Sequence, residues 1–416
     1  MPASSNGLPT STTFTAAWVL PIAEPPIPRG HVSCAYGQVI DVGTGRDGAI
    51  DLGRVALMPA LVNAHTHLEL SYLRGRVDPA RTFVDWVRML LALRRESPDP
   101  RAPHIVEAAA HAYGEAVSSG TGVFGDVSNT LVTPLLGPRA PHVAGIVFHE
   151  LIGFRADGAE THIDAARRLR AHATAGVRIG LAPHAPYSVS PALFRAIGEE
   201  LKRSGSPPTT VHLAEGPEEV RLLRDGSGPW RQVLEELGAW DAAWQPPGMS
   251  PVAYVESLGF LGPSVLAVHV VQCDETDVAR LAKSGTTVVV CPRSNAHVGA
   301  GSSPIEAFYR AGLRVAIGTD SLASAPNLNM FEEMAHVRRA APAVAARRIL
   351  ESATRVGAEA LGCGSQHGVI AAGAATGLIA VSLPDDVVDV EEYLLSGVEP
   401  QRVSWVWHPR HDAATA

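Results

Sequence analysis

The order of apolar segments through the middle of the chain constrains its fold more than any other feature. Eight short apolar stretches between residues 60 and 317 are mostly followed by segments long enough to form a helix. Such alternation predicts right-handed βα units around a parallel sheet, and eight units favour an α/β fold of the closed (β/α)8 TIM-barrel type. The expected strands are Ala60–Asn63, Gly122–Asp126, His142–Phe148, Val177–Leu181, Thr209–His212, Val265–His269, Thr287–Cys291 and Arg314–Ile317.

Two of the intervening helices can be located from their patterns. In Thr82–Arg95, the side chains of Phe83, Val87 and Leu90 share one face while charged side chains lie elsewhere, which is the pattern of an amphipathic helix. A second helix is expected near Arg231–Leu237.

The two ends of the chain have a different character. Thr13–Leu57 contains short β-like runs separated by proline and glycine, and Gly368–Leu383 resembles it. Each segment is too small to fold alone, so we expect the two to pair in one small β domain, of the β-sandwich type. The predicted division is therefore residues 1–57 and 366–416 for the small domain and 58–365 for the barrel.

Composition excludes several classes of protein. Hydrophobic residues make up 46% of the 416 residues and charged residues 18%, which predicts a soluble globular protein. The net charge of −8 and the scattered Lys and Arg residues give no support to nucleic-acid binding. The four cysteines form no C-x-x-C pair, and no apolar run is long enough to span a bilayer. Since the N-terminus also lacks a signal-peptide pattern, we expect a cytoplasmic protein without a membrane partner.

Five ionisable side chains stand at the ends of predicted strands. His65 and His67 end the first strand and, two residues apart, point to the same side. His212, His269 and Asp320 end the fifth, sixth and eighth strands. Taken singly, each histidine could be a hydrogen-bonded core residue and the aspartate a helix N-cap. Barrels of this type place their active sites at this end of the strands, so the five side chains together predict a shared site.

Three imidazoles and one carboxylate suit Zn²⁺, and also Fe²⁺ or Mn²⁺. Such an ion would lower the pKa of a bound water, so that hydroxide exists near neutral pH. Glu215, three residues past His212, is close enough to take the water's proton and deliver it to a substrate. The alternative for Glu215 is a first-turn glutamate favoured by the helix dipole.

Five motifs in this order resemble the amidohydrolase superfamily, in particular the aminohydrolases that deaminate heterocyclic bases and nucleosides. They are MPALVNAHTH (58–67), APHAPYS (182–188), HLAE (212–215), CPRSN (291–295) and GTDSLAS (318–324). Two positions depart from the usual pattern, Ala60 and Thr376-Gly377.

The resemblance implies metal ligands at His65, His67, His212 and Asp320. It also implies that Glu215 is the proton shuttle, that His269 hydrogen-bonds the attacking water, and that Asp320 passes a proton to the leaving group. Relatives with two metals bridge them through a carbamylated lysine at the end of the fourth strand. Neither lysine of this chain, Lys202 or Lys283, lies near that position, so one divalent metal is expected.

The segment His67–Ser71, the helix with Trp86 and the stretch Ala182–Ser190 resemble the aminodeoxyfutalosine deaminases of menaquinone biosynthesis. This resemblance implies hydroxide attack at C6 of the adenine of 6-amino-6-deoxyfutalosine, giving the hypoxanthine form and ammonia. By analogy Glu69, expected on the same face as His65 and His67, and His184 would hold ribose or ring nitrogens. Ser71 and Trp86 would line the pocket for the aromatic substituent; otherwise Trp86 is a core residue and Ser71 a helix cap.

Other functions remain open at this level. The same site would suit a deaminase of guanine, adenosine or S-adenosylhomocysteine, or a chlorotriazine hydrolase. A catalytically inactive scaffold is a further alternative, although the intact ligands and Glu215 argue against it. His149-Glu150 begins like a zinc-protease helix, but position 153 is glycine instead of the second histidine. A small molecule is the expected partner, and a homodimer remains open because dimers are common in the resembled family.

Overall fold

The centre of the protein holds two parallel sheets of four strands each. The computed structural model describes residues 11–45, 47–139, 144–171 and 178–409. The first sheet is ordered β6-β7-β8-β9 and the second β10-β11-β12-β13. These strands are β6 (Leu61–Thr66), β7 (Thr121–Ser128), β8 (Ala144–Leu151), β9 (Ile179–Pro183), β10 (Thr209–Leu213), β11 (Val265–His269), β12 (Thr287–Val290) and β13 (Arg314–Ile317). Each predicted strand position is thereby confirmed, except that residues 142, 143 and 177 lie outside the described residues.

Hydrogen bonds join the edges of the two sheets near the carboxyl ends of their strands. On one side the amides of Thr319 and Asp320, which follow β13, donate to the carbonyl of His65 at 3.0 and 3.1 Å. On the other side the amide of His212 donates to the carbonyl of His184 at 2.9 Å. The side chains that end β6, β10 and β13 are therefore held at one place.

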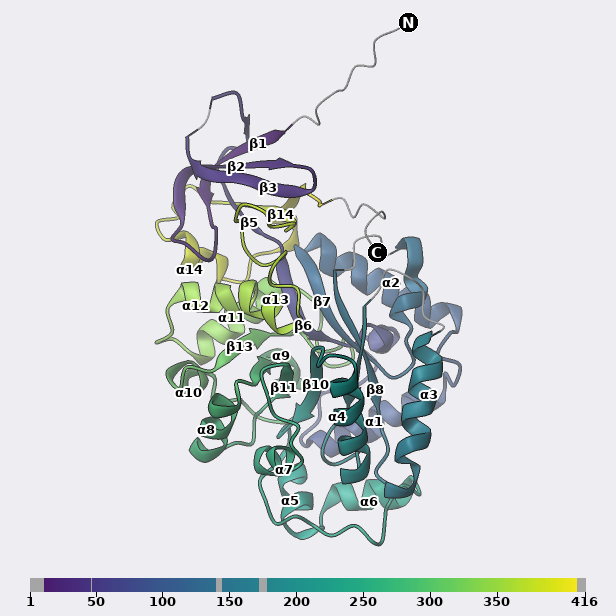
Figure 1. Cartoon of the computed structure of the whole chain (residues 1–416). Helices are drawn as coiled ribbons and strands as arrows, with labels where there is room; N and C mark the ends of the chain where they lie inside the picture. Colours follow the sequence, from purple (N-terminus) through teal and green to yellow (C-terminus); the bar gives the residue numbers. More distant parts are fainter. Residues whose placement is uncertain (1–10, 46, 140–143, 172–177, 410–416) are drawn as a thin grey trace, which may run out of the picture.

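Helices surround the two sheets (Figure 1). Six of them begin with a proline, whose fixed φ angle suits the first helical position. Their bounds are α1 (Phe83–Arg95), α2 (Pro103–Ser118), α3 (Ala159–Ala171), α4 (Pro191–Arg203), α5 (Pro217–Asp225), α6 (Pro229–Glu236), α7 (Pro251–Ser257), α8 (Glu275–Ser284), α9 (Pro292–His297), α10 (Ile305–Arg310), α11 (Met330–Ala340), α12 (Ala346–Ser352) and α13 (Arg355–Ala360).

The helix expected over Thr82–Arg95 is confirmed as α1. Thr82 is its N-cap, and the Thr82 hydroxyl accepts a hydrogen bond from the amide of Asp85 at 3.2 Å. Phe83 and Leu90 of the predicted apolar face are buried. The second expected helix corresponds to α6, which begins two residues earlier, at Pro229. No helix in the described ranges has both the length and the apolar content needed to cross a bilayer.

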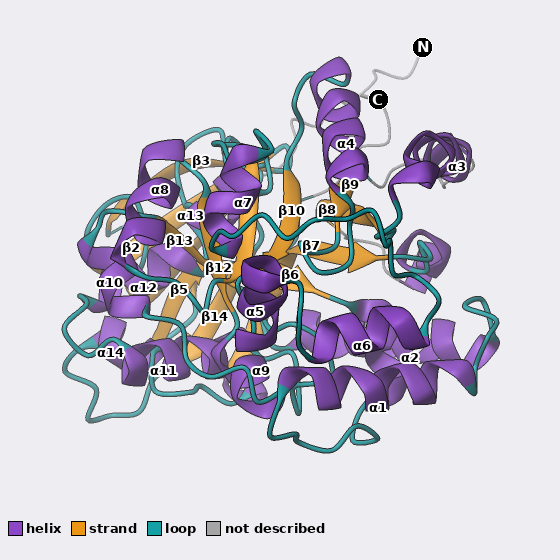
Figure 2. Cartoon of the chain, turned by 90° about the horizontal axis from the view of Figure 1, so that it is seen from below, coloured by secondary structure: helices purple, strands orange, loops and turns teal. Residues whose placement is uncertain are grey.

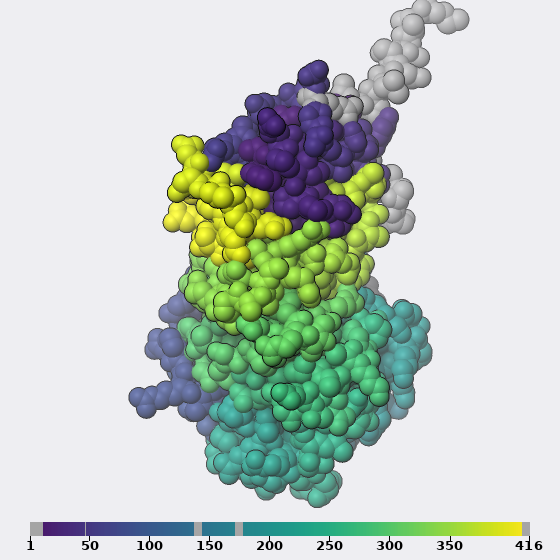
Figure 3. All heavy atoms as spheres, turned by 90° about the vertical axis from the view of Figure 1, so that its left-hand side faces the viewer, coloured from purple at the N-terminus to yellow at the C-terminus, as the bar shows by residue number. Residues whose placement is uncertain are grey.

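Both ends of the chain contribute to a third, seven-stranded sheet. Its order is β15-β14-β5-β1-β2-β3, with β4 paired to β1. The strands are β1 (Thr12–Val19), β2 (Ile27–Ala35), β3 (Gln38–Thr44), β4 (Ile50–Asp51), β5 (Val55–Pro59), β14 (Leu378–Ser382) and β15 (Val403–Trp407), and α14 (Val390–Leu394) lies between the last two. In Figure 3 the purple N-terminal and yellow C-terminal segments lie side by side at one end of the molecule.

The strands of this sheet can be compared with the predicted domain boundaries. Residue 58, the predicted start of the barrel, falls within β5, which pairs with β1 and β14, and β6 begins at Leu61. The described strands of the small domain form a single sheet, so the β-sandwich and the boundaries stay predictions. The two departures from the family pattern meet here, because the amide of Ala60 donates to the carbonyl of Gly377 at 2.8 Å.

Candidate active site

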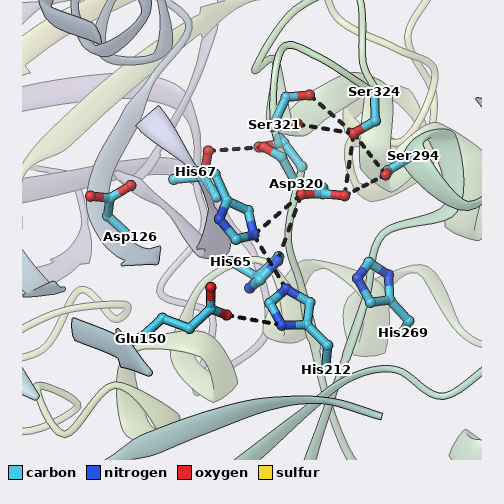
Figure 4. Close-up of polar contacts among 12 residues, drawn as sticks. His65, His67, Asp126, Glu150, His212, His269, Ser294, Asp320, Ser321 and Ser324 are labelled. Carbon is cyan, nitrogen blue, oxygen red and sulfur yellow. Dashed lines mark hydrogen bonds and ion pairs between the residues drawn. The ribbon is translucent and has the colours of Figure 1, made fainter. Parts of the chain in front are cut away.

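Three of the histidines singled out from the sequence converge at the strand ends (Figure 4). Ring nitrogens of His65, His67 and His212 all lie within 4.8 Å of one another. The Nε2 atoms of His67 and His212 are 3.2 Å apart. All three side chains are buried, with His65 fully so. The structure therefore brings residues 145 positions apart in sequence around a common centre.

Asp320 completes this cluster from the segment after β13. Its Oδ1 atom lies 3.8 Å from His65 Nε2 and 3.6 Å from His67 Nε2. Its Oδ2 atom accepts hydrogen bonds from the hydroxyls of Ser294 at 2.5 Å and Ser324 at 3.2 Å. Burial pushes the pKa of Asp320 upward, but His67, His269 and the Ser294 hydrogen bond bring it below its usual value. One carboxylate oxygen is thus fixed from behind while the other faces the imidazoles.

These residues fit a divalent metal. Both ring nitrogens of the fully buried His65 are without a hydrogen-bond partner among the described residues. Leaving buried polar atoms unpaired is costly, and a cation at the common centre would bind one of them. Burial and the neighbouring histidines lower the pKa of His65, and burial lowers that of His67. The rings of His65 and His67 are therefore neutral, as metal ligation requires. Burial lowers the pKa of His212, but the neighbouring Glu150 outweighs this and raises it to about 9, so a metal ion bound there would have to displace a proton from His212. Three nitrogens and one carboxylate oxygen suit Zn²⁺, and also Fe²⁺ or Mn²⁺.

Glu215 and His269 face one another beside the cluster. Glu215 Oε1 lies 3.6 Å from His269 Nε2, and the other ring nitrogen of His269 lies 2.8 Å from the side-chain oxygen of Asn295. Because Asn295 presents an acceptor, we assign the His269 proton to Nδ1, which leaves Nε2 directed at Glu215. Burial raises the pKa of Glu215 well above its usual value and lowers that of His269 to about 4. A carboxyl group with a raised pKa can exchange protons near neutral pH.

The backbone at these strand ends is bent into the left-handed region. Ala214, His269 and Asp320 have φ angles of 53°, 73° and 58°. Non-glycine residues rarely adopt this conformation, and it is concentrated at functional sites where the surrounding structure holds it in place. The bends turn the strand ends so that Glu215, His269 and Asp320 border the same space.

Glu219 holds the bend before Glu215. Its two carboxylate oxygens accept hydrogen bonds from the backbone amides of Ala214, at 3.1 Å, and Glu215, at 3.0 Å. The side chain of Glu219 is fully buried. We expect Glu219→Gln to lower kcat by roughly 10–100-fold at unchanged metal content, because the glutamine amide would face one of these donors and shift Glu215. Steady-state kinetics and metal analysis would measure this. Glu218→Gln is the matched control, and equal kcat values for the two variants would contradict a positioning role.

Glu150 belongs to the site but was missed by the sequence analysis. It lies near the end of β8, and its Oε1 atom is 3.2 Å from His212 Nδ1. Its Oε2 atom accepts a hydrogen bond from the side-chain amide of Asn129 at 2.8 Å. Burial raises its pKa, but His184 and His212 outweigh this and hold it below the usual range. His212 Nδ1 also lies 3.1 Å from the carbonyl oxygen of His184, so this carbonyl and the Glu150 carboxylate together fix the tautomer and orientation of the ring. The signal for Glu150 in the sequence is its position beside His149 near the end of a predicted strand.

The four predicted substrate contacts separate into two pairs. Trp86 and His184 line the same cavity as the catalytic residues, whereas Glu69 and Ser71 do not. The two-residue alternation does not extend to Glu69, because the strand ends at Thr66 and a 3-10 helix (Leu68–Leu73) follows.

The hydrogen bonds of Glu69 are with the end of β7 and the turn that follows it. Its Oε2 atom accepts hydrogen bonds from the hydroxyls of Ser128 and Thr130, both at 2.5 Å. Its Oε1 atom accepts a hydrogen bond from the backbone amide of Asn129 at 3.2 Å. Ser71 is buried, and its hydroxyl has no hydrogen-bond partner among the described residues. The predicted substrate roles of Glu69 and Ser71 therefore rest on the resemblance alone, and they stay predictions.

A cavity of about 350 Å³ opens onto the cluster. His67, His212, Glu215, His269 and Asp320 line one part of it, and side chains of α1 and α6 line much of the rest. These two helices lie side by side (Figure 2), and Arg88 of α1 pairs with Glu236 of α6 at 2.9 Å. The volume of this cavity is in the range of sites that bind small organic molecules.

Asp126, near the end of β7, supplies a pH test of the fold around the site. Its carboxylate accepts the amide of Leu68 at 2.9 Å and the hydroxyl of Thr133, and burial raises its pKa to about 7. Between about pH 4 and pH 7 the unfolded chain releases this proton while the folded chain keeps it. The free energy of unfolding therefore falls as pH rises, by at most roughly 4 kcal/mol from this group.

We expect Asp126→Asn to remove the contribution of Asp126 to this fall in the free energy of unfolding. Asparagine can accept a hydrogen bond from the amide of Leu68 and donate one to the hydroxyl of Thr133 without ionising. The variant should gain stability relative to the parent as pH rises from 4.5 to 7.5. Urea unfolding with a chelator in every sample would measure the difference. Asp386→Asn, at an exposed position, is the control; parallel pH profiles for all three proteins would refute the prediction.

Comparisons with known proteins agree with this geometry. Residues 56–403 match the model of the amidohydrolase family. An aminodeoxyfutalosine deaminase of Deinococcus radiodurans is 31% identical over 83% of this chain and 81% of its own length. A 5-methylthioadenosine/S-adenosylhomocysteine deaminase of Syntrophobacter fumaroxidans is 29% identical over 85% and 80%.

Two solved structures are also similar. An adenosine deaminase from Xanthomonas campestris with bound zinc has a TM-score of 0.81 and 26% identity, covering 96% of this chain and 91% of its own. The Helicobacter pylori aminofutalosine deaminase bound to methylthio-coformycin has a TM-score of 0.79 at 20% identity, covering 95% and 97%, a likeness of fold.

The chain belongs to the amidohydrolase family, whose members are metal-dependent. Its fold is of the TIM-barrel α/β type. It is a hydrolytic deaminase.

Proposed function

We propose that this protein deaminates adenine-type nucleosides, and that its substrate is 6-amino-6-deoxyfutalosine. The observation that carries the proposal is the meeting of Glu215 and His269 beside the cluster of His65, His67, His212 and Asp320. We assign one divalent ion, Zn²⁺, to that cluster. We also propose that the two four-stranded sheets close into one barrel, since hydrogen bonds link both pairs of edges. The cytoplasmic location and the homodimer remain predictions from the sequence.

The reaction adds water at C6 of the purine and releases ammonia. A bound divalent cation lowers the pKa of water and so supplies a nucleophile near neutral pH. Glu215 takes a proton from the attacking water and delivers it to N1, a task that its raised pKa suits. His269 orients the attacking water by hydrogen bonding. Asp320 takes the remaining proton of the new C6 hydroxyl and passes it to the departing amino group, so that C6 becomes a carbonyl carbon. The C6–N bond then breaks, leaving the hypoxanthine form.

The preference for 6-amino-6-deoxyfutalosine rests on two observations besides the Deinococcus relative. This nucleoside carries a carboxyphenyl group, which needs an apolar cavity and a cation. The cavity has apolar walls from α1 and α6, and Arg94 is the one arginine or lysine among its described lining residues. The Arg94 guanidinium makes two loose contacts, with Asn129 at 3.4 Å and Glu69 at 3.6 Å. The product would then enter menaquinone biosynthesis.

A second candidate is deamination of 5-methylthioadenosine or S-adenosylhomocysteine, which is favoured by relatives such as the Syntrophobacter enzyme. Ammonia release from 6-amino-6-deoxyfutalosine, both of these compounds, adenosine, guanine and a chlorotriazine would separate the candidates. We expect kcat/KM to be highest for the first compound. Good turnover of another compound with none of the first would overturn the assignment. Metal-loaded protein that is inert toward all of them would indicate a scaffold.

A further inference from the structure

The carboxylate of Glu69 is buried and is bonded to one short segment, residues 128–130, although it does not line the cavity at the metal cluster. Besides the hydroxyls of Ser128 and Thr130 and the amide of Asn129, the backbone amide of Thr130 donates to its Oε2 atom at 3.2 Å. Four hydrogen bonds therefore join this carboxylate to the end of β7 and the turn that follows. A buried carboxylate bonded in this way fixes the conformation of its donors.

The segment needs such support because the next residue has an unfavourable backbone conformation. Leu131 has a φ angle of 54°, in the left-handed region that non-glycine residues rarely adopt. Its side chain is buried, and its amide donates to the Ser128 hydroxyl oxygen at 2.8 Å. The same hydroxyl donates to Glu69 at 2.5 Å. Since a strained backbone persists only where surrounding contacts hold it, Glu69 stabilises the shape of this turn.

The turn places the side-chain amide of Asn129 between a cation and a carboxylate. The amide oxygen accepts from Arg94 Nη1 at 3.4 Å, and the amide nitrogen donates to Glu150 Oε2 at 2.8 Å. The nitrogen also lies 3.3 Å from the backbone carbonyl oxygen of Glu150. These neighbours allow one orientation of the amide, from which we assign its oxygen and nitrogen. Asn129 therefore holds the Glu150 side chain in place as long as the turn keeps its shape.

Glu150 passes this constraint on to a metal ligand. Its Oε1 atom lies 3.2 Å from His212 Nδ1, and Nε2 of the same ring lies 3.2 Å from His67 Nε2 in the cluster (Figure 4). Outer contacts of this kind set the orientation and basicity of a ligating imidazole. Glu69 itself stands two residues after His67, in the 3-10 helix that follows β6. It thus connects the segment that carries one ligand to the support of another.

We propose that Glu69 is a positioning residue for the metal ligand His212. It acts through Asn129, whose amide holds the Glu150 carboxylate against the imidazole. The inference rests on the proposed assignment of a divalent ion to the cluster. It gives Glu69 a different role from the substrate contact that the sequence resemblance implies, and the two roles predict different results. A substrate contact changes the affinity for a nucleoside, whereas a positioning residue changes the affinity for the metal.

The test compares Glu69→Gln, Asn129→Leu and the double variant in the full-length protein. Glutamine keeps the size of Glu69 but turns an NH2 group toward donors, and leucine has about the size of asparagine without its amide. The Kd for Zn²⁺ is measured by competition with a coloured chelator, which needs no turnover. We expect it to rise about tenfold in Asn129→Leu and about three- to tenfold in Glu69→Gln. Because both act along one path, the double variant should bind Zn²⁺ about as weakly as Asn129→Leu alone.

A spectroscopic measurement separates positioning from a general loss of stability. The visible absorption of the Co²⁺-substituted protein responds to the geometry of the metal ligands, so it should change in both single variants. Glu200→Gln is the matched control. Glu200 is also a buried glutamate, which accepts a hydrogen bond from Arg167 at 2.7 Å, but it does not line the cavity. Its variant should keep the Zn²⁺ Kd and the Co²⁺ spectrum of the parent.

Three results would overturn the positioning role. They are an unchanged Zn²⁺ Kd in Glu69→Gln, losses that multiply in the double variant, and an equal loss in Glu200→Gln. A raised KM for the nucleoside at unchanged metal affinity would assign Glu69 to the substrate instead. If Glu69→Gln does not fold, Thr130→Val takes its place in the same cycle. It removes one hydroxyl that Glu69 accepts, so a smaller rise in Kd, about twofold, is expected.

The proposed function is judged by separate measurements. A parent protein that binds no Zn²⁺ would refute the metal assignment and the positioning role together. Tight binding by the parent with unchanged variants would refute the positioning role alone. Deamination of adenine-type nucleosides is decided by ammonia release from the parent protein, whichever result the variants give.

Discussion

Replacing Glu215 by glutamine should lower kcat for deamination by roughly 10²–10⁴-fold, the range that a positioned general acid–base contributes. Glutamine keeps the size of the side chain but can neither take the proton of water nor deliver it to the purine ring. Since Glu215 is buried and lies 3.6 Å from His269, no solvent-exposed group can readily replace it. KM should change little, because the variant leaves the cavity walls intact. Steady-state measurement of ammonia release would give both constants.

The matched control for this variant is Glu218→Gln. Glu218 is also a buried glutamate, three residues further along, but it does not line the cavity. Metal content should equal that of the parent in both variants, which would separate proton transfer from loss of the ion. Retention of more than a tenth of the parent kcat by Glu215→Gln would exclude Glu215 as the proton shuttle.

Removing the His65 imidazole should abolish both metal retention and activity. His65 Nε2 faces Asp320 at 3.8 Å, and neither ring nitrogen has a hydrogen-bond partner among the described residues. Losing an outer partner of a ligand already costs about 10–100-fold in metal affinity, and losing a ligand itself should cost more. We therefore expect about one metal per chain in the parent and roughly a tenth or less in His65→Ala after dialysis. Elemental analysis would measure this directly.

Chelation of the parent protein should have the same effect on activity, and added Zn²⁺ should restore it in the parent alone. His31→Ala serves as the control, because His31 is another buried histidine, paired with Asp41 at 3.1 Å in the small sheet. A full metal complement in His65→Ala would show that the ion lies elsewhere. More than one bound ion per parent chain would contradict the single-metal assignment.

Much of this architecture could be read from local patterns. The eight strands were located because short apolar runs repeat between helix-length segments, as expected for strands that are buried on both sides in a parallel sheet. Helix α1 followed from the apolar period of Phe83, Val87 and Leu90, although the helix begins one residue later than expected, with Thr82 as its N-cap. His65, His67, His212 and Asp320 could be grouped because parallel strands present their carboxyl ends at one edge, so a position along each strand predicts a position in space.

Contacts between distant side chains could not be read in this way. The position of Glu150 near a strand end indicates the site, but it does not identify a partner, and the 3.2 Å approach to His212 is what shows that Glu150 supports a ligand. Glu69 was expected on the face of the ligands because an alternating pattern was extended past the strand end at Thr66, into a 3-10 helix.

The sequence by itself determined the type of fold, the order of its strands and the side chains that meet at their ends, since these depend on periodicity and on strand direction. Only the tertiary structure decided which partners orient those side chains and which surfaces enclose the substrate. An example is the stacking of Trp230, in α6, on Tyr187, in the turn between β9 and α4. The physical reason is that periodicity is a property of neighbours along the chain, whereas packing depends on how separate elements approach one another.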